Sequence, residues 1–184
     1  MMCDLYELMV SLPDGTLRQP QRFHNTIYST FLESGGERDF LFKGVKAGGE
    51  AAIIRARRFP ERFAAMARPI TYAADRSDYD FHLTASPQYR DRATQKLQFV
   101  APSDNNLNHV LWLKRKGEES GFTISDDTVC ERRIKRVPEK GNLSIDECEF
   151  SGHLAVFDHA LFVKALEHGI GPRGAYGYGL LTLY

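Results

Sequence analysis

Hydrophobic periodicity divides the chain into two successive halves, and the first half predicts six elements. Segments in which apolar and polar residues alternate, or in which a short apolar run lies between turn residues, predict strands. Apolar residues that recur every three or four positions predict helices. In order, the elements are a strand at 5–12, a helix at 20–33, strands at 39–45 and 51–57, a helix at 60–67 and a strand at 69–73.

The second half repeats the order strand, helix, strand, strand, helix, strand. Its elements are a strand at 79–85, a helix at 107–117 capped by Ser103 or Asp104, strands at 122–128 and 143–157, a helix at 158–167 ended by Gly169, and a strand at 178–184. Two polar, basic segments predict a long loop at 88–102 and a loop or hairpin at 130–141. Two βαββαβ units predict an α+β protein of two tandem ferredoxin-like (RRM-like) domains, at 1–76 and 77–184.

Composition narrows the class of protein without indicating a function. The chain has 184 residues, of which 42% are hydrophobic and 26% charged, as in ordinary soluble domains. No apolar run approaches the roughly 20 residues of a membrane span, and the first residues lack the basic segment of a signal peptide. Cys3, Cys130 and Cys148 match neither a disulfide framework nor a zinc pattern. We therefore expect a cytoplasmic protein with no membrane partner.

The charges balance overall but are segregated along the chain. There are 24 basic and 24 acidic side chains, which argues against a nucleic-acid partner unless the basic residues gather locally. They do gather, at 55–68, 90–96 and 130–140, whereas 141–184 is mainly acidic. Such basic strips suit a ligand with a phosphate backbone. Runs of charged residues are also common on ordinary solvent-exposed surfaces, so charge alone leaves both explanations open.

A glycine-rich string near the C-terminus carries the most specific signal. Residues 169–174 match the pattern G-x-G-x-x-G, but a predicted helix precedes them and a predicted strand follows. A dinucleotide site needs the reverse order, since the helix N-terminus holds the pyrophosphate, so that function is excluded. The longer string 169–183, with glycines at 169, 171, 174, 177 and 179, resembles the C-terminal motif of the RAMP superfamily of CRISPR proteins.

The wider sequence resembles one branch of that superfamily, the CasE-type CRISPR RNA endoribonucleases. The matching segments are His24 with Ile27-Tyr28, Arg38-Asp39-Phe40-Leu41-Phe42, Trp112-Leu113-Lys114-Arg115-Lys116-Gly117, and Gly169-Ile170-Gly171-Pro172 with Gly177-Tyr178-Gly179-Leu180-Leu181. The resemblance implies an enzyme that binds the CRISPR repeat RNA stem–loop and cuts at its 3′ base without a metal or cofactor. The RNA's own 2′-OH would attack, leaving a 2′,3′-cyclic phosphate and a 5′-OH. Other subunits of a Cascade-like effector complex would be its partners.

The resemblance also implies roles for individual residues. His24 matches the family histidine that transfers the proton, and imidazole titrates near neutral pH. Gln21 replaces the family tyrosine three residues earlier, so Tyr28, one helical turn later, is the candidate substitute. Lys140 or Arg136 would neutralise the scissile phosphate. The residues expected to bind RNA are Arg90, Arg92, Lys96, Arg132, Arg133, Lys135, Arg136, Gly171, Arg173, Gly174 and Gly177.

Two other interpretations stay open. The same fold would also suit a non-catalytic subunit that binds the repeat hairpin, which Gln21 favours. An unrelated ferredoxin-like binding domain is favoured by the zero net charge. No metal site is expected, because the remaining histidines do not have the spacing of ligands. These are His82, His109, His153, His159 and His168.

Overall fold

The first half of the chain forms a four-stranded antiparallel sheet with one long helix. The computed structural model describes residues 4–32, 38–46, 48–137, 141 and 143–184. The elements of the first half are β1 (Tyr6–Ser11), α1 (Pro20–Phe31), β2 (Phe40–Lys46), β3 (Glu50–Ala56), α2 (Glu61–Ala64) and β4 (Arg68–Pro69). The sheet order is β2-β3-β1-β4, which is the ferredoxin-like order, with the fourth strand beside the first.

Strand alternation gives this sheet one apolar face and one face that mixes polar and apolar residues. Leu8, Phe42 and Ile54 are buried in a core that also contains Phe23 and Ile27 of α1. Because successive side chains of a strand point to opposite faces, their neighbours Glu7, Lys43 and Arg55 lie on the other face. The helix begins at Pro20, whose fixed φ and missing N–H suit a first helical turn.

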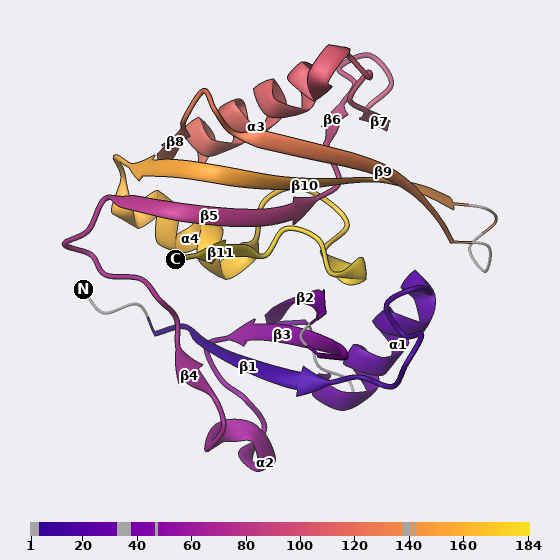
Figure 1. The fold of residues 1–184 in the computed structure, drawn as a ribbon, viewed down its shortest axis with the longest axis vertical. Coiled ribbons are helices and arrows are strands. Elements are labelled where there is room, and N and C mark those ends of the chain that lie inside the picture. The colour runs from indigo at the N-terminus through magenta and orange to yellow at the C-terminus, as the bar shows by residue number, and fades with distance from the viewer. Residues whose placement is uncertain (1–3, 33–37, 47, 138–140, 142) are drawn as a thin grey trace.

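The second half repeats the arrangement around a five-stranded sheet (Figure 1). Its elements are β5 (Asp78–Ala85), β6 (Gln88–Arg90), β7 (Leu97–Phe99), η1 (Asp104–Asn106), α3 (Leu107–Glu119), β8 (Phe122–Ile124), β9 (Val129–Val137), β10 (Leu143–Val156), α4 (His159–His168), η3 (Gly174–Tyr176) and β11 (Leu181–Leu183). The sheet order is β11-β5-β10-β8, with β9 also paired to β10. Both helices bury side chains in one core with this sheet, Trp112 from α3 and Phe162 from α4 among them.

The structure corrects three predictions about this half. The predicted strand at 122–128 is shorter, at Phe122–Ile124. The predicted loop at 88–102 is a hairpin, in which β6 and β7 pair from Gln88 with Phe99 to Arg90 with Leu97. Its turn closes because Asp91 Oδ1 accepts hydrogen bonds from Ala93 N and Thr94 N, a local side-chain interaction that polar sequences favour. The predicted strand at 178–184 shortens to Leu181–Leu183, since Gly177 and Gly179 have positive φ.

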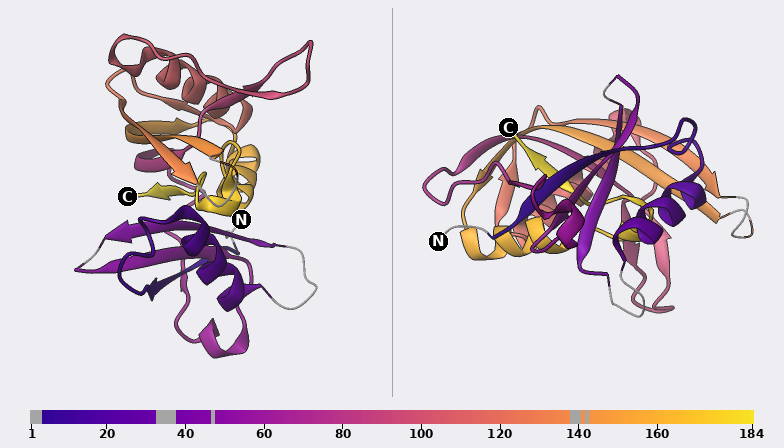
Figure 2. Two further views of the ribbon diagram at one scale, coloured as in Figure 1. Left: turned by 90° about the vertical axis from the view of Figure 1, so that its right-hand side faces the viewer. Right: turned by 90° about the horizontal axis from the view of Figure 1, so that it is seen from below.

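The polar faces of the two sheets meet each other. Lys43 Nζ donates to Thr182 Oγ1 (2.5 Å), and Arg55 donates to the carbonyls of Leu166 (3.2 Å) and Leu181 (2.8 Å). Arg55 also pairs with Glu7 in its own sheet (2.5 Å). Figure 2 shows the C-terminal segment, in yellow, between the two halves. Among the described residues, no helix combines the length and apolarity that crossing a membrane requires.

Candidate active site

His24 lies where α1 of the first half meets the glycine-rich segment of the second. Its Nδ1 is 2.7 Å from the carbonyl oxygen of Ala175, and the side chain is half-buried. Because a carbonyl oxygen only accepts hydrogen bonds, Nδ1 must carry the proton of the neutral ring. Nε2 then keeps its lone pair, so the contact fixes the tautomer and leaves one nitrogen able to accept a proton.

Two tyrosines lie against this imidazole. The Tyr28 ring, one helical turn along α1, has its centroid 4.0 Å from that of His24, and the Tyr176 ring is 5.8 Å away. Gln21, at the position of the family tyrosine, donates from Nε2 to Asn25 Oδ1 (2.8 Å). Its Oε1 is buried and has no partner among the described residues. The aromatic side chain beside the histidine is therefore Tyr28.

The glycine-rich segment approaches its neighbours more closely than a side chain would allow. A Cβ at Gly177, where φ is +86°, would lie 2.8 Å from a ring carbon of Phe23 on α1. One at Gly171 (φ +83°) would lie 2.9 Å from the Trp112 ring, and one at Gly174 would lie 2.9 Å from the Arg38 guanidinium. These glycines therefore let the segment pack between α1 and α3, an intramolecular role beside their expected RNA contacts.

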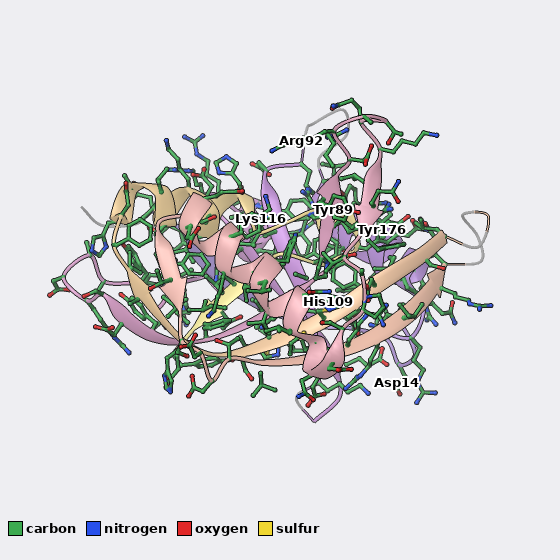
Figure 3. All side chains as sticks on the ribbon, turned by 90° about the horizontal axis from the view of Figure 1, so that it is seen from above. Asp14, Tyr89, Arg92, His109, Lys116 and Tyr176 are labelled. Carbon is green, nitrogen blue, oxygen red and sulfur yellow. The ribbon has the colours of Figure 1, made fainter. Side chains whose placement is uncertain are left out.

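The glycine-rich segment contributes to the lining of two grooves. The first, the hairpin groove, lies between the β6–β7 hairpin and α3 and has a volume of about 1030 Å³. Figure 3 looks onto α3 and the hairpin, with Lys116 on the helix and Tyr89 and Arg92 on the hairpin. The residues of this groove that matter here are Tyr89, Arg90, Arg92, Arg115, Lys116 and Gly171. Lys96 is exposed on the same hairpin but does not line the groove.

The second groove, the sheet cleft, lies between the polar faces of the two sheets and has a volume of about 550 Å³. Its lining includes Lys43 of β2, His82 of β5 and Tyr176. Burial lowers the pKa of Lys43 from its ordinary value of 10.5 to about 8. Burial, together with the nearby Lys43 ammonium, also holds the pKa of His82 below its usual value. The sequence did not predict a role for either residue, because the residues of one strand do not show which other sheet that strand will pack against.

The basic residues of β9 are mostly paired with acids of β10. Arg132 Nε is 2.7 Å from Asp146, and Lys135 Nζ is 2.6 Å from Glu147. Arg133 lies 3.8 Å from Glu149 and 3.3 Å from Glu131. Arg136 is exposed, with no ion pair inside the described ranges, and Lys140 lies outside the described residues. The acidic and basic stretches that are separate in the sequence are therefore cross-strand neighbours.

A buried polar cluster appears where no metal site was expected. Ligand-type atoms of His109, Asp146 and Cys148 lie within 4.8 Å of one another. His109 Nε2 is 3.4 Å from Asp146 Oδ2, and burial lowers the pKa of His109. Asp146 also pairs with Arg132, whereas His109 Nδ1 is buried without a hydrogen-bond partner among the described residues.

The fold and site together define a tandem ferredoxin-like protein with a glycine-rich segment between its two sheets. The model of the CRISPR associated protein family matches residues 11–184, and the chain belongs to that family. Among curated proteins, it is 32% identical over 117 residues to the CRISPR-associated endoribonuclease Cse3 of Thermus thermophilus. That match covers 56% of this chain and 54% of Cse3, so it spans about half the length of the relative.

Solved structures confirm the fold over almost the whole chain. The structure of Thermus thermophilus Cse3 bound to an RNA representing a pre-cleavage complex matches with a TM-score of 0.79 and 23% identity, over 98% of both chains. Cas6e from Escherichia coli K-12 matches with a TM-score of 0.70 and 20% identity, over 97% and 98%. A chain of Escherichia coli Cascade bound to a double-stranded DNA target matches with a TM-score of 0.55 and 18% identity, over 97% and 96%. The predicted tandem ferredoxin-like architecture is thus confirmed.

Proposed function

We propose that this protein is an endoribonuclease that binds the stem–loop of CRISPR repeat RNA and cuts at the 3′ base of the stem. The observation that carries the proposal is the contact between His24 Nδ1 and the Ala175 carbonyl, which leaves Nε2 as a proton acceptor. The family of the chain and the name of the Thermus thermophilus relative support RNA processing as the setting.

His24 Nε2 would take the proton from the 2′-OH that precedes the scissile phosphate. The resulting 2′ oxygen attacks the adjacent phosphorus as the bond from phosphorus to the 5′ oxygen breaks. The products are a 2′,3′-cyclic phosphate and a 5′-OH, whose proton must be supplied as the oxygen leaves. Tyr28, in ring contact with His24, is our candidate for assisting that transfer. Because the nucleophile is part of the RNA, we propose a reaction that needs no metal and no cofactor.

Developing charge on the phosphate would be neutralised by cations near the glycine-rich segment. Arg136 and Lys140 remain the candidates from the sequence. Arg173 is a third candidate, since it belongs to the glycine-rich segment and directly precedes Gly174. A guanidinium there could form a charge-assisted hydrogen bond with a phosphate oxygen.

The hairpin groove is our candidate for the RNA stem. A-form RNA is recognised mainly through phosphates and 2′-hydroxyls, which suits exposed arginines such as Arg90 and Arg92. Lys96 would contact the same stem from the hairpin. We propose smaller contributions from Arg132, Arg133 and Lys135, because acids of β10 already pair with them. The β6–β7 hairpin would thus make the main contacts with the RNA stem, and the β9–β10 pair would contribute less.

The proposal extends to domains, partners and location. We divide the chain into units at 1–76 and 77–184, with the boundary inside the segment between β4 and β5. The likeness to a chain of Escherichia coli Cascade supports association with other subunits of a similar effector complex. Such a complex, and this protein with it, would act in the cytoplasm.

A non-catalytic role is the second candidate, and Gln21 favours it. A glutamine cannot share a proton as a phenol can, and here its amide Nε2 donates to Asn25. A protein of this kind would bind the repeat hairpin and hold it in the complex without cutting.

Cleavage of the host's own repeat RNA in EDTA tests the proposal. We expect one cut in the wild type and none with a 2′-deoxy nucleotide before the cut. His24→Ala should reduce the rate by about 10²–10⁴-fold, the usual contribution of a positioned acid–base group, with RNA affinity unchanged. His168→Ala, an exposed histidine on α4, is the matched control and should cut normally. Tight binding without any cut would favour the non-catalytic role.

A further inference from the structure

The cations that the first half contributes to the sheet cleft have no role in the function proposed above. We propose that the sheet cleft binds the single-stranded RNA that continues 3′ from the stem, beyond the scissile phosphate. This inference rests on the proposed function, because it takes the cut to lie at the base of a stem. It names the part of the substrate that the first half of the chain would hold.

The position of the glycine-rich segment supports this assignment. Gly171 and Pro172 line the hairpin groove, whereas Tyr176 and Gly177 line the sheet cleft. Ala175, whose carbonyl contacts His24, lies between these two sets of residues in the sequence. An RNA whose stem lies in the hairpin groove and whose scissile phosphate is at His24 would continue into the sheet cleft.

The charges that line the cleft suit a single-stranded polyanion. Its acids are Glu147 and Glu149, and both are engaged, by Lys135 at 2.6 Å and by Arg133 at 3.8 Å. Tyr178 also donates to Glu147 (2.9 Å). The cations that the first half contributes are Arg18, Lys43 and Lys46. None of these three has a carboxylate partner within 4 Å in the described part of the chain.

Acids near the outer end of the cleft do not cancel these charges. Asp14 and Glu50 lie close to Arg18 and Lys46, but no ion pair joins them among residues that the structure describes. Glu50 is instead bonded to the backbone N–H of Leu17 (2.8 Å). Arg18 and Lys46 are both exposed, so they remain available to phosphate groups.

Lys43 is the buried cation of the cleft. The residue is 5% exposed, and among the described residues the hydrogen-bond contacts of Nζ are with Thr182 Oγ1 at 2.5 Å and His82 Nδ1 at 3.5 Å. An ammonium so far from water is costly without an anion, and its lowered pKa has the same cause. A phosphate entering the cleft would offset that cost. Exposed Tyr184, at 61% accessibility, offers a ring on which a base can stack at the rim.

The inference is tested by comparing the binding of two RNA probes that differ only in length. Both probes are the host's repeat hairpin with a 2′-deoxy nucleotide at the cut, so that neither is cleaved. One ends at the base of the stem, and the other continues for about eight nucleotides on the 3′ side, within the usual length of single-strand sites. Fluorescence anisotropy over a salt series gives the affinity and, from the salt slope, how many phosphates the protein neutralises.

We expect the wild type to bind the extended probe at least tenfold more tightly. The double variant R18Q/K46Q should abolish that gain and lower the salt slope by about 0.7 for each phosphate that is no longer neutralised, with the short probe unaffected. Lys164→Gln, an exposed cation on α4 outside the cleft, should change neither. Equal affinity of the wild type for both probes would overturn the inference and leave the proposed function standing. Failure to bind either probe would overturn both.

Lys43→Met provides a variant whose loss of binding cannot be attributed to unfolding. The cost of burying the ammonium is present below the folded-state pKa of about 8 and is relieved as pH rises toward the value of the unfolded chain. At neutral pH the methionine variant should therefore unfold at a higher temperature than the wild type. The ratio of its affinities for the extended and the short probe should nevertheless be at least threefold smaller than in the wild type. Retention of the full gain would exclude Lys43 from the binding site.

Discussion

The β9–β10 pair and the β6–β7 hairpin are both basic in sequence, but their charges are arranged differently in the structure. On β9, Arg132, Arg133 and Lys135 each lie beside an acid of the same antiparallel pair. On the hairpin, Arg92 and Lys96 have no carboxylate partner in the described part of the chain. A basic strip in a sequence therefore indicates a nucleic-acid surface only where the fold provides no acids opposite it.

The register of the sheet explains the difference. β10 runs antiparallel to β9, with Arg133 opposite Glu147 and Arg132 opposite Cys148. This register places the acidic segment 146–149 directly beside the basic one, and opposite charges across strands stabilise the pair. The β6–β7 hairpin pairs only with itself, and its one acid, Asp91, is committed to the turn.

The largest effect expected from this comparison is on stability. Asp146 is 1% exposed and lies between Arg132 and His109, so Asp146→Ala leaves a guanidinium unpaired at the edge of the core. Breaking such a buried pair costs about 3–5 kcal/mol, which urea unfolding will measure. Asp126→Ala is the control, because Asp126 pairs with Lys114 while 96% exposed, and its loss should destabilise the protein far less. Equal losses in the two variants would show that the pairs of β9 and β10 are not part of the core.

An intermediate effect is expected on RNA affinity. The triple variant R90Q/R92Q/R115Q removes three exposed cations of the hairpin groove. It should bind the repeat hairpin roughly tenfold or more weakly and lower the salt slope by about 0.9 for each phosphate that is no longer neutralised, with stability unchanged. Arg58→Gln and Lys164→Gln, exposed cations outside both grooves, should have no such effect. Normal affinity in the triple variant would remove the hairpin groove from the RNA site.

The smallest effect is expected at Arg133. Its side chain is 61% exposed, and its distances to Glu131 and Glu149 are 3.3 and 3.8 Å. Exposed pairs of this kind contribute about 0–1 kcal/mol, so Arg133→Gln should change the unfolding free energy by no more than that. RNA affinity should fall less than threefold. A loss as large as that of the triple variant would mean that the acids of β10 do not neutralise this strip.

The elements that sequence patterns predicted well are those with strong periodicity or specific end signals. Alternation in β1 and β5, the Pro20 start of α1 and the Gly169 end of α4 all lie where predicted. The β6–β7 hairpin was missed, because its strands have three residues each and bury only Gln88, which is too short for alternation to predict a strand.

The candidate site was found through the family motif rather than through periodicity. His24 and the glycine-rich segment are 151 residues apart, as Nδ1 and the Ala175 carbonyl show, so no local pattern joins them. Gly177 packs on Phe23 of α1, which explains why a motif near the C-terminus depends on a helix near the N-terminus.

What the sequence determined by itself is the number, order and type of the main elements, and the motif that relates the chain to its family. These depend on residues close together in the chain, whose hydrophobic spacing and turn chemistry act locally. What only the tertiary structure decided is which charges are neutralised and which face an open groove. Lys43, Lys135 and Arg92 are all cations in the sequence, but one is buried, one is paired and one is exposed. The free energy of a charge depends on burial and on partners that only the assembled sheets bring near.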